Sequence, residues 1–306
     1  MKLSKEQLGL GLRGFAMGMA DIVPGVSGGT VALITGVYDR LITSISSVNK
    51  EFIKKVLNLD VKGALLHLNA PFLIPLVCGI FLAILSMSRV MHFMMGNYSI
   101  QTWSLFFGLI LASIVFVGKT VENIFTSKHL ALVAVGTAVG YAIVSLIPVE
   151  TPESLPFLFF SGCIAICAMI LPGISGSFIL LILGKYLYVT SALKNPFSTD
   201  SITIIIIFAS GCLVGLLSFS KLLNYLLKNF HNYTMCVLTG FMIGSMKKIW
   251  PWKEVIESKV IRGKTHVLRE ANILPVEFNS EVFFALSLMI IGIILVLLLE
   301  KISTKK

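Results

Sequence analysis

Charged side chains are scarce in this chain: Asp, Glu, Lys and Arg make up 13% of its 306 residues, while hydrophobic residues make up 56%. In soluble domains roughly a quarter of the residues are charged. A fold in water could not bury this much apolar surface, so the lipid bilayer must form part of the solvent. The composition therefore excludes an ordinary water-soluble domain and predicts a single membrane domain over residues 1–306.

Cysteine is also scarce, and its spacing lacks the usual zinc and redox motifs. Five cysteines lie in apolar stretches, and Cys163 and Cys167 stand one helical turn apart rather than in a CxxC pair. We expect no metal site and no cofactor. The formal net charge of +10 comes from Lys and Arg spread through short connectors. Such a distribution is typical of loops that flank membrane spans, and we expect no nucleic-acid partner.

Long apolar segments fill most of the chain. A helix needs about 20 mostly apolar residues to cross a bilayer. Six segments approach that length and predict about six full transmembrane helices in an all-α polytopic membrane protein. They cover residues 72–87, 103–118, 130–147, 202–220, 233–246 and 282–299.

Two further apolar stretches are interrupted by matching glycine-rich sequences. Residues 15–37 contain PGVSGG at 24–29, and residues 157–183 contain PGISGS at 172–177. Proline cannot donate a backbone hydrogen bond, and several glycines favour unwinding. Non-helical backbone at membrane depth must be buried in protein or line a watery cavity. Each stretch is therefore predicted to be a re-entrant or discontinuous helical segment, and we call the two interruptions the first break and the second break.

The breaks belong to an internal repeat. Residues 23–38, VPGVSGGTVALITGVY, align with residues 171–186, LPGISGSFILLILGKY, at an offset of 148 (171 − 23). We place the first repeat at about 12–118, the second at about 157–247 and a final helix at 282–300. Three spans separate the breaks, so a re-entrant first segment makes the halves an inverted repeat. Secondary transporters with this arrangement hold their site between discontinuous helices near the midplane.

The breaks themselves are the candidate substrate site. Unwound backbone exposes N–H groups, and the following helix N-terminus adds positive partial charge, so an anion could bind there. The alternative is that glycine and serine merely allow close helix packing. Two matching Pro-Gly breaks exceed what packing requires, which favours binding. The candidate residues are Pro24, Gly25, Ser27, Gly28, Gly29 and Thr30, with Pro172, Gly173, Ser175, Gly176 and Ser177.

Four charged residues complete the candidate site. Arg89 and Lys221 match at an offset of 132 (221 − 89), and each either receives an anion from its side of the membrane or is an ordinary snorkelling charge. Asp21 precedes the first break, and an ionisable group at this depth is a functional candidate. We predict that it couples transport to protons with Arg13 as a resting partner; a helix cap is the alternative.

The sequence supports an enzymatic function less well than a transport function. Gly25 to Gly29 formally satisfy the G-x-S-x-G nucleophile motif, but a nucleophilic serine needs a base within hydrogen-bond reach. All five histidines fall in connectors or near span ends. A similar motif also occurs a second time, in the second break, although one nucleophile would suffice. An intramembrane serine hydrolase therefore ranks third among the functions considered.

Three motifs carry a resemblance to a known family. MGMADIVPGVSGGTVALITGVYDRL at 17–41, ILPGISGSFILLILGKY at 170–186 and GFMIGSMKKIWPWK at 240–253 are similar to signatures of the PopT-like polyprenyl-phosphate transporter family, over essentially the whole chain. The resemblance implies a translocase that returns undecaprenyl phosphate from the outer to the inner leaflet. Its phosphate headgroup would bind at the breaks while its tail stays in lipid.

Without the resemblance, the residues predict only that the substrate is an anion and that the protein works by alternating access. The second function considered is therefore a secondary transporter of a small soluble anion. We expect a multi-pass protein of the bacterial cytoplasmic membrane, a lipid substrate rather than catalysis, and an oligomeric state that leaves a homodimer open. The distribution of Lys and Arg favours an N-terminus on the cytoplasmic side.

Overall fold

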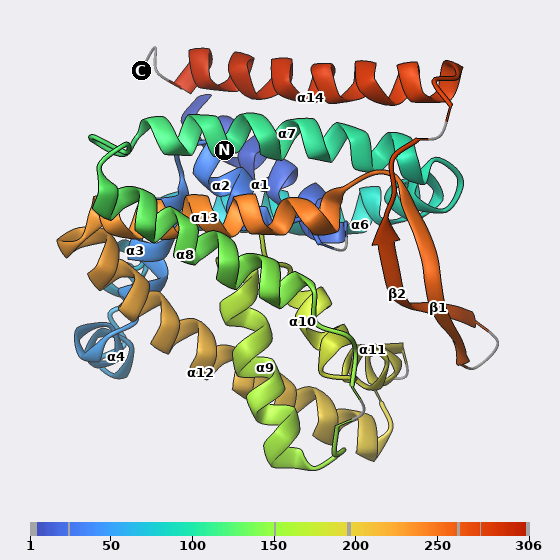
Figure 1. The fold of residues 1–306 in the computed structure, drawn as a ribbon. Helices are drawn as coiled ribbons and strands as arrows, with labels where there is room; N and C mark the ends of the chain where they lie inside the picture. The colour runs from blue at the N-terminus through green and yellow to red at the C-terminus, as the bar shows by residue number, and fades with distance from the viewer. Residues whose placement is uncertain are drawn as a thin grey trace.

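The computed structural model describes residues 5–23, 25–149, 151–194, 197–261, 264–275 and 277–303. Within these ranges the chain forms fourteen helices and one two-stranded antiparallel hairpin (Figure 1). The all-α polytopic class predicted from the sequence is confirmed.

The second half of the chain repeats the order of elements in the first half. Each half runs through a helix, a break, two short helices, two long helices and a last helix. The first half inserts α4 and α5, and the second inserts β1 and β2. The elements of the first half are α1 (Lys5–Ile22), α2 (Gly28–Ile34), α3 (Tyr38–Ser46), α4 (Lys50–Leu57), α5 (Val61–His67), α6 (Ala70–Asn97), α7 (Ser99–Lys119) and α8 (Ser127–Val144). Those of the second half are α9 (Leu155–Ile170), α10 (Gly176–Ile182), α11 (Tyr186–Lys194), α12 (Thr199–Asn229), α13 (His231–Ile249), β1 (Lys253–Ile261), β2 (Lys264–Asn272) and α14 (Ser280–Ser303).

Five helices, α6, α7, α8, α12 and α14, are long and apolar enough to cross a membrane. A sixth crossing is possible if α10 and α11, which meet at 115°, form one bent segment. The span predicted at 233–246 is a helix, α13, but it is not among the five. It is the central helix, packed against α7, α8 and α12, and it buries Thr234, Thr239 and Ser245. A helix surrounded by protein need not be apolar on every side.

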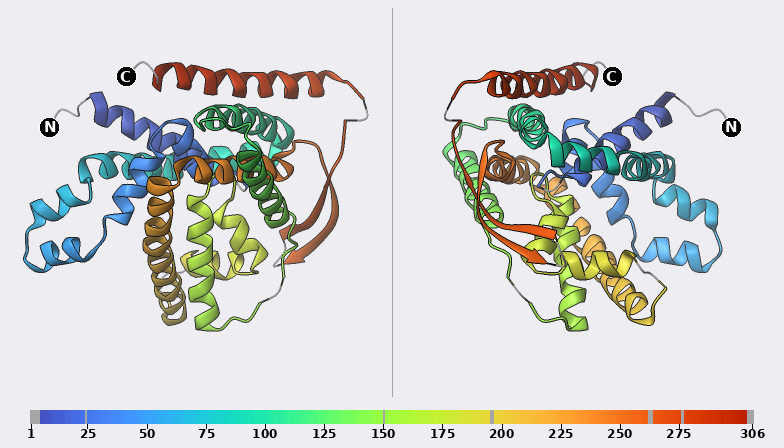
Figure 2. Two further views of the ribbon diagram at one scale, coloured as in Figure 1. Left: turned by 60° about the vertical axis from the view of Figure 1, so that its left-hand side comes forward. Right: turned by 90° about the vertical axis from the view of Figure 1, so that its right-hand side faces the viewer.

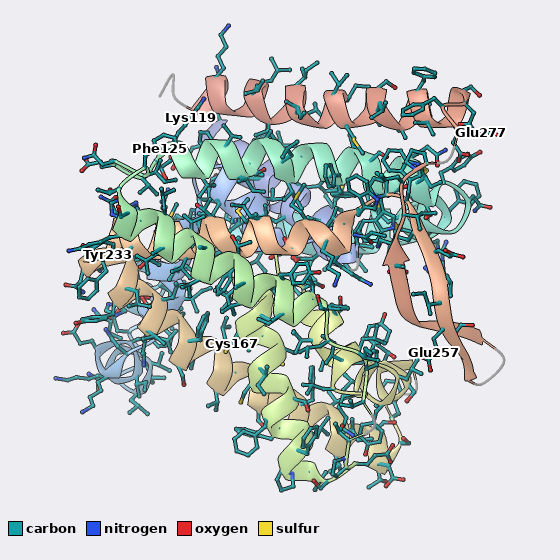
Figure 3. All side chains as sticks on the ribbon, in the orientation of Figure 1. Lys119, Phe125, Cys167, Tyr233, Glu257 and Glu277 are labelled. Carbon is teal, nitrogen blue, oxygen red and sulfur yellow. The ribbon has the colours of Figure 1, made fainter. Side chains whose placement is uncertain are left out.

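Packing ties the two halves together. Within each half the first helix packs on the first long helix, α1 on α6 and α9 on α12, whereas the last helices cross over, α8 onto α13 and α14 onto α7. The start of α1 and the end of α14 lie away from the hairpin, as the left view of Figure 2 shows. Lys119, Phe125 and Tyr233 mark the end opposite the hairpin, and Glu257 and Glu277 mark the hairpin end (Figure 3).

Glycines allow these helix pairs to approach backbone to backbone. A Cβ at Gly14 in α1 would lie 2.0 Å from the Leu76 carbonyl oxygen of α6, and one at Gly211 in α12 would lie 2.1 Å from the Phe159 carbonyl oxygen of α9. Helices in lipid gain little from the hydrophobic effect on pairing, so close van der Waals contact at small residues holds them together.

We expect Gly14→Ala to destabilise the protein by about 1–3 kcal/mol or more, because the added methyl group must push two backbones apart. Gly9→Ala is the matched control, since a Cβ at Gly9, on the same helix, meets nothing within 4 Å. Alanine is the better helix former, so the control should be neutral or mildly stabilising. Thermal unfolding of both purified variants in detergent measures the difference, and equal midpoints would contradict the close α1–α6 contact.

Candidate functional site

The two breaks are in direct contact, although 148 residues separate them along the chain. Ser27 places its hydroxyl 3.1 Å from the Leu171 carbonyl oxygen and 3.2 Å from that of Met169. The Gly173 amide donates to the Thr30 hydroxyl at 3.0 Å. We call this set of contacts the joint between the halves.

The joint satisfies polar groups that the second break leaves without helical partners. The last carbonyls of a helix have no intrahelical donors. At the end of α9 these carbonyls accept from Ser27 and from the Tyr38 hydroxyl, which lies 3.2 Å from the Ile170 carbonyl oxygen. Ser27 and Tyr38 are both almost fully buried. These buried hydroxyls therefore supply the donors that water would supply at an exposed helix end.

Four glycines give both halves the same backbone geometry. Gly25 and Gly173 begin the breaks with φ of 89° and 84°, and Gly36 and Gly184 end the short helices with φ of 69° and 64°. Each pair is related by the offset of 148 (173 − 25 and 184 − 36). Only glycine adopts these left-handed angles without strain, which explains why glycine stands at these positions in both halves.

Two glycine amides of the first break already donate to protein acceptors. The Gly28 amide donates to the Asp21 carboxylate at 2.7 Å, and the Gly29 amide donates to the Ser27 hydroxyl at 3.1 Å. Asp21, at the end of α1, therefore accepts from the first amide of α2, whose N-cap residue is Ser27. In the described chain no ion pair joins it to Arg13.

The second break is less completely occupied. Ser175 makes no capping bond to α10, and its hydroxyl pairs with that of Ser177 at 2.9 Å. The position equivalent to Asp21 is Met169 (21 + 148), so no carboxylate stands over the start of α10. Pro172, Gly173 and Gly176 are buried around this break. Pro24 of the first break lies outside the described residues.

The glycines inside the breaks face protein atoms. A Cβ at Gly28 would lie 2.5 Å from the Asp21 carboxylate, one at Gly29 would lie 2.5 Å from the Ile170 carbonyl oxygen, and one at Gly176 would lie 2.6 Å from the Ala165 carbonyl oxygen. A larger side chain there would disturb the joint itself. Glycine is therefore required at these positions both by the close packing of the breaks and by the hydrogen bonds that their amides make.

The predicted cations are distributed differently from the breaks. Arg89 on α6 and Lys221 on α12 are exposed, and no contact with either break is found in the described chain. Arg13 lines a cavity of about 400 Å³ with Arg40, whose guanidinium lies 3.4 Å from the Glu6 carboxylate and 4.4 Å from the centre of the Phe72 ring. We call this the arginine cavity. It also touches Gly36, at the end of α2.

Sequence reasoning missed a second cationic cavity, on the other side of the first break. It measures about 650 Å³ and contains Lys247, Lys248 and Lys253 together with Glu270 of the hairpin. We call it the lysine cavity. A Cβ at Gly25 would lie 3.0 Å from Lys248 Cγ, so the cavity adjoins the break directly. Its lysines fall within the motif at 240–253, but they look like ordinary connector charges until the hairpin folds back.

Ser27 is not placed as a nucleophile. Its hydroxyl contacts backbone carbonyls and the Gly29 amide. Among the described side chains, His67 bonds to Ser47 and Asn49, and His129 bonds to Asn123 and Thr126. No described histidine lies within hydrogen-bond distance of Ser27.

The chain is similar to known membrane proteins over nearly all of its length. Residues 17–266 match the family model described as VCA0040-like, undecaprenyl phosphate translocase-like. A polyprenyl-phosphate transporter of Vibrio cholerae is 43% identical over 301 residues, which is 96% of each chain. A polyprenyl-phosphate transporter of Staphylococcus aureus is 32% identical over 255 residues, 78% of this chain and 85% of the relative. No solved structure matches the chain.

We expect Thr30→Val to destabilise the joint by about 1–3 kcal/mol, because it leaves the buried Gly173 amide without an acceptor at nearly unchanged side-chain volume. Thr190→Val is the matched control, since the Thr190 hydroxyl bonds only to carbonyls of its own helix. Thermal unfolding in detergent compares the two. A Thr30→Val shift no larger than that of the control would contradict the joint.

Proposed function

The chain belongs to the undecaprenyl phosphate translocase-like family, and we propose that it carries undecaprenyl phosphate from the outer to the inner leaflet of the bacterial cytoplasmic membrane. The single observation that carries this proposal is the joint between the breaks, with a cationic cavity on each side of it. The whole-chain similarity to proteins named polyprenyl-phosphate transporters supports the choice of substrate.

The chemistry of the substrate fits this arrangement. A phosphate monoester carries a charge of about −1.5 to −2 at neutral pH, so its headgroup needs cations and donors along its whole path. The lysine cavity supplies cations near Gly25, which precedes α2, and the arginine cavity supplies cations near Gly36, which follows it. The hydroxyls of Ser175 and Ser177 supply donors between them. The isoprenoid tail, being apolar, can remain in the lipid.

The joint suggests how access alternates. Its bonds connect the two halves at the breaks, while α3 packs on α12 and the crossed helices α8 and α14 fasten each half to the other. Rocking of the halves about the joint would open one cavity while closing the other, as expected for transporters built from inverted repeats. The protein acts in this account as a carrier and not as an enzyme, which the names of its relatives support.

Transport of a fluorescent polyprenyl phosphate in proteoliposomes tests the function. We expect the purified protein to equalise the lipid between leaflets, measured as the fraction quenched by a membrane-impermeant reagent, while protein-free liposomes equalise it slowly. Excess inorganic phosphate should compete weakly. Lipid movement no faster than in protein-free liposomes would contradict the proposal, and uptake of inorganic phosphate instead would favour a soluble-anion transporter.

Asp21 is proposed to couple this transport to protons. Asp21→Asn removes the titrating group but keeps a carbonyl oxygen that can accept from the Gly28 amide. We therefore expect it to fold and bind substrate while its transport rate loses its dependence on pH. Asp21→Ala should also lose the cap, at about 1 kcal/mol of stability. An Asp21→Asn variant with the wild-type pH profile would leave Asp21 only its capping role.

A further inference from the structure

The lysine cavity holds more positive than negative charge. Three ammonium groups and one carboxylate line it, contributed by α13, β1 and β2. Lys253 has a side chain only 10% exposed, and those of Lys248 and Glu270 are 23% and 26% exposed. Charges this far removed from water need partners of opposite sign. One carboxylate cannot balance three ammonium groups, so the cavity is suited to a further anion.

Glu270 stands where such an anion would bind. Its carboxylate lies 3.1 Å from Lys248 Nζ and 3.4 Å from Lys253 Nζ. Lys247 points to the same cavity, where its ammonium donates to the Ser145 hydroxyl at 2.7 Å and lies 4.3 Å from the centre of the Tyr141 ring. Lys247 thus has no carboxylate partner within the described chain.

The environment keeps the charges in place at neutral pH. Burial lowers the pKa of Lys253 to about 8, with Glu270 opposing that shift and Lys248 adding to it. Burial raises the pKa of Glu270, but the attraction of Lys253 and Lys248 outweighs this, so that its pKa lies below the ordinary value. Glu270 is therefore an anion, and Lys253 remains mostly protonated near pH 7.

The cavity lies against α10, the short helix that follows the second break, because Phe178 and Leu181 are among its lining residues. Lys248 Nζ lies 5.1 Å from the centre of the Phe178 ring on α10, and the Lys248 side chain also contacts the Gly25 position of the first break. An anion bound between Lys248 and Lys253 would thus lie close to Phe178 of α10 and to Gly25 of the first break. It would be well placed to move from the hairpin toward the hydroxyls of Ser175 and Ser177.

We propose that the lysine cavity is a docking site for a phosphate monoester, and that Glu270 occupies the phosphate position until the ligand displaces it. This inference rests on the proposed function for the identity of the ligand, a lipid phosphate. A phosphate oxygen replaces the carboxylate between Lys248 and Lys253, and Lys247 contributes the third ammonium group. With the N-terminus on the cytoplasmic side, the hairpin faces outward and the cavity receives lipid from the outer leaflet.

The hairpin has attachments that do not depend on Glu270. The Lys253 ammonium donates to the Lys248 carbonyl oxygen at 2.7 Å, and the Asn272 amide donates to the Lys247 carbonyl oxygen at 2.8 Å. The Trp250 indole donates to the Ile273 carbonyl oxygen at 2.8 Å. Loss of the Glu270 charge should therefore free the cations without releasing the hairpin.

Binding of geranylgeranyl monophosphate to the full-length protein in nanodiscs tests the site. Glu270→Gln should tighten binding about three- to tenfold, because it removes the competing carboxylate. Lys248→Gln should weaken binding about tenfold or more, the size expected for loss of a hydrogen-bonded charge pair. Lys248→Arg should bind close to the wild type. Glu257→Gln, an exposed position on β1 (Figure 3), controls for the change in net charge, and Lys228→Gln on α12 does the same for the lysine variant.

Opposite signs for the Glu270 and Lys248 variants support the site, because a merely structural ion pair would weaken binding in both. The proposal is overturned if Glu270→Gln binds no tighter than Glu257→Gln, or if folded Lys248→Gln binds like the wild type. Titration with inorganic phosphate separates the sources: binding as tight as that of the lipid would assign the site to free phosphate. If the wild-type protein binds the lipid phosphate but does not transport it, the proposed function is rejected and the site stands. If the protein transports the lipid and the lysine variants bind and transport it like the wild type, this site is rejected and the function stands.

Discussion

A helix that ends inside a membrane leaves carbonyl and amide groups that lipid cannot satisfy, and this constraint organises the whole molecule. Here the end of α9 depends on the other half of the chain: Ser27 and Tyr38 donate to its carbonyls, and Thr30 accepts from the amide that follows. The second break cannot form at low cost without the first. A pair of broken segments is thus held as one unit, and the long helices are arranged around it. To form, the breaks need the four glycines with left-handed backbone angles locally, and they need the contacts of the joint between distant parts of the chain.

The dependence runs in one direction, which gives the two halves different roles. The amides at the start of α2 donate to Asp21 and Ser27, whereas at the equivalent positions Met169 carries no charge and the Ser175 hydroxyl pairs with that of Ser177 instead of capping α10. The lysine cavity and the arginine cavity differ in the same way, because each uses cations of a different kind from a different set of elements. An approximate sequence repeat therefore supports an asymmetric path. Asymmetry of this kind is what a carrier needs if loading and release are to occur in different surroundings.

Much of the fold could be predicted from local patterns, because spans and breaks are local properties. Apolar length identified most of the spans, and the aligned PGVSGG and PGISGS sequences identified both breaks. The joint could not be predicted, since no pattern states that the Ser27 hydroxyl reaches the end of α9 rather than its own helix. The lysine cavity was missed for a similar reason: Glu270 lies 17 residues beyond Lys253 (270 − 253), and only the fold of the hairpin brings it between two lysines. Arg89 and Lys221 match each other in the repeat and both are exposed, so a role for them in substrate binding stays a prediction.

The central claim is that the joint separates two cationic cavities that open on opposite membrane faces in turn. Single cysteines report this directly, with Gly9→Cys in the arginine cavity and Ile256→Cys in the lysine cavity, in a background whose five native cysteines are replaced. The measurement is the rate of labelling by a membrane-impermeant maleimide added to one face of oriented vesicles, with and without polyprenyl phosphate. The account predicts that each position is labelled from one face only, that the faces differ, and that substrate changes the two rates in opposite directions. Labelling of both positions from the same face, or parallel changes in the two rates, would contradict it.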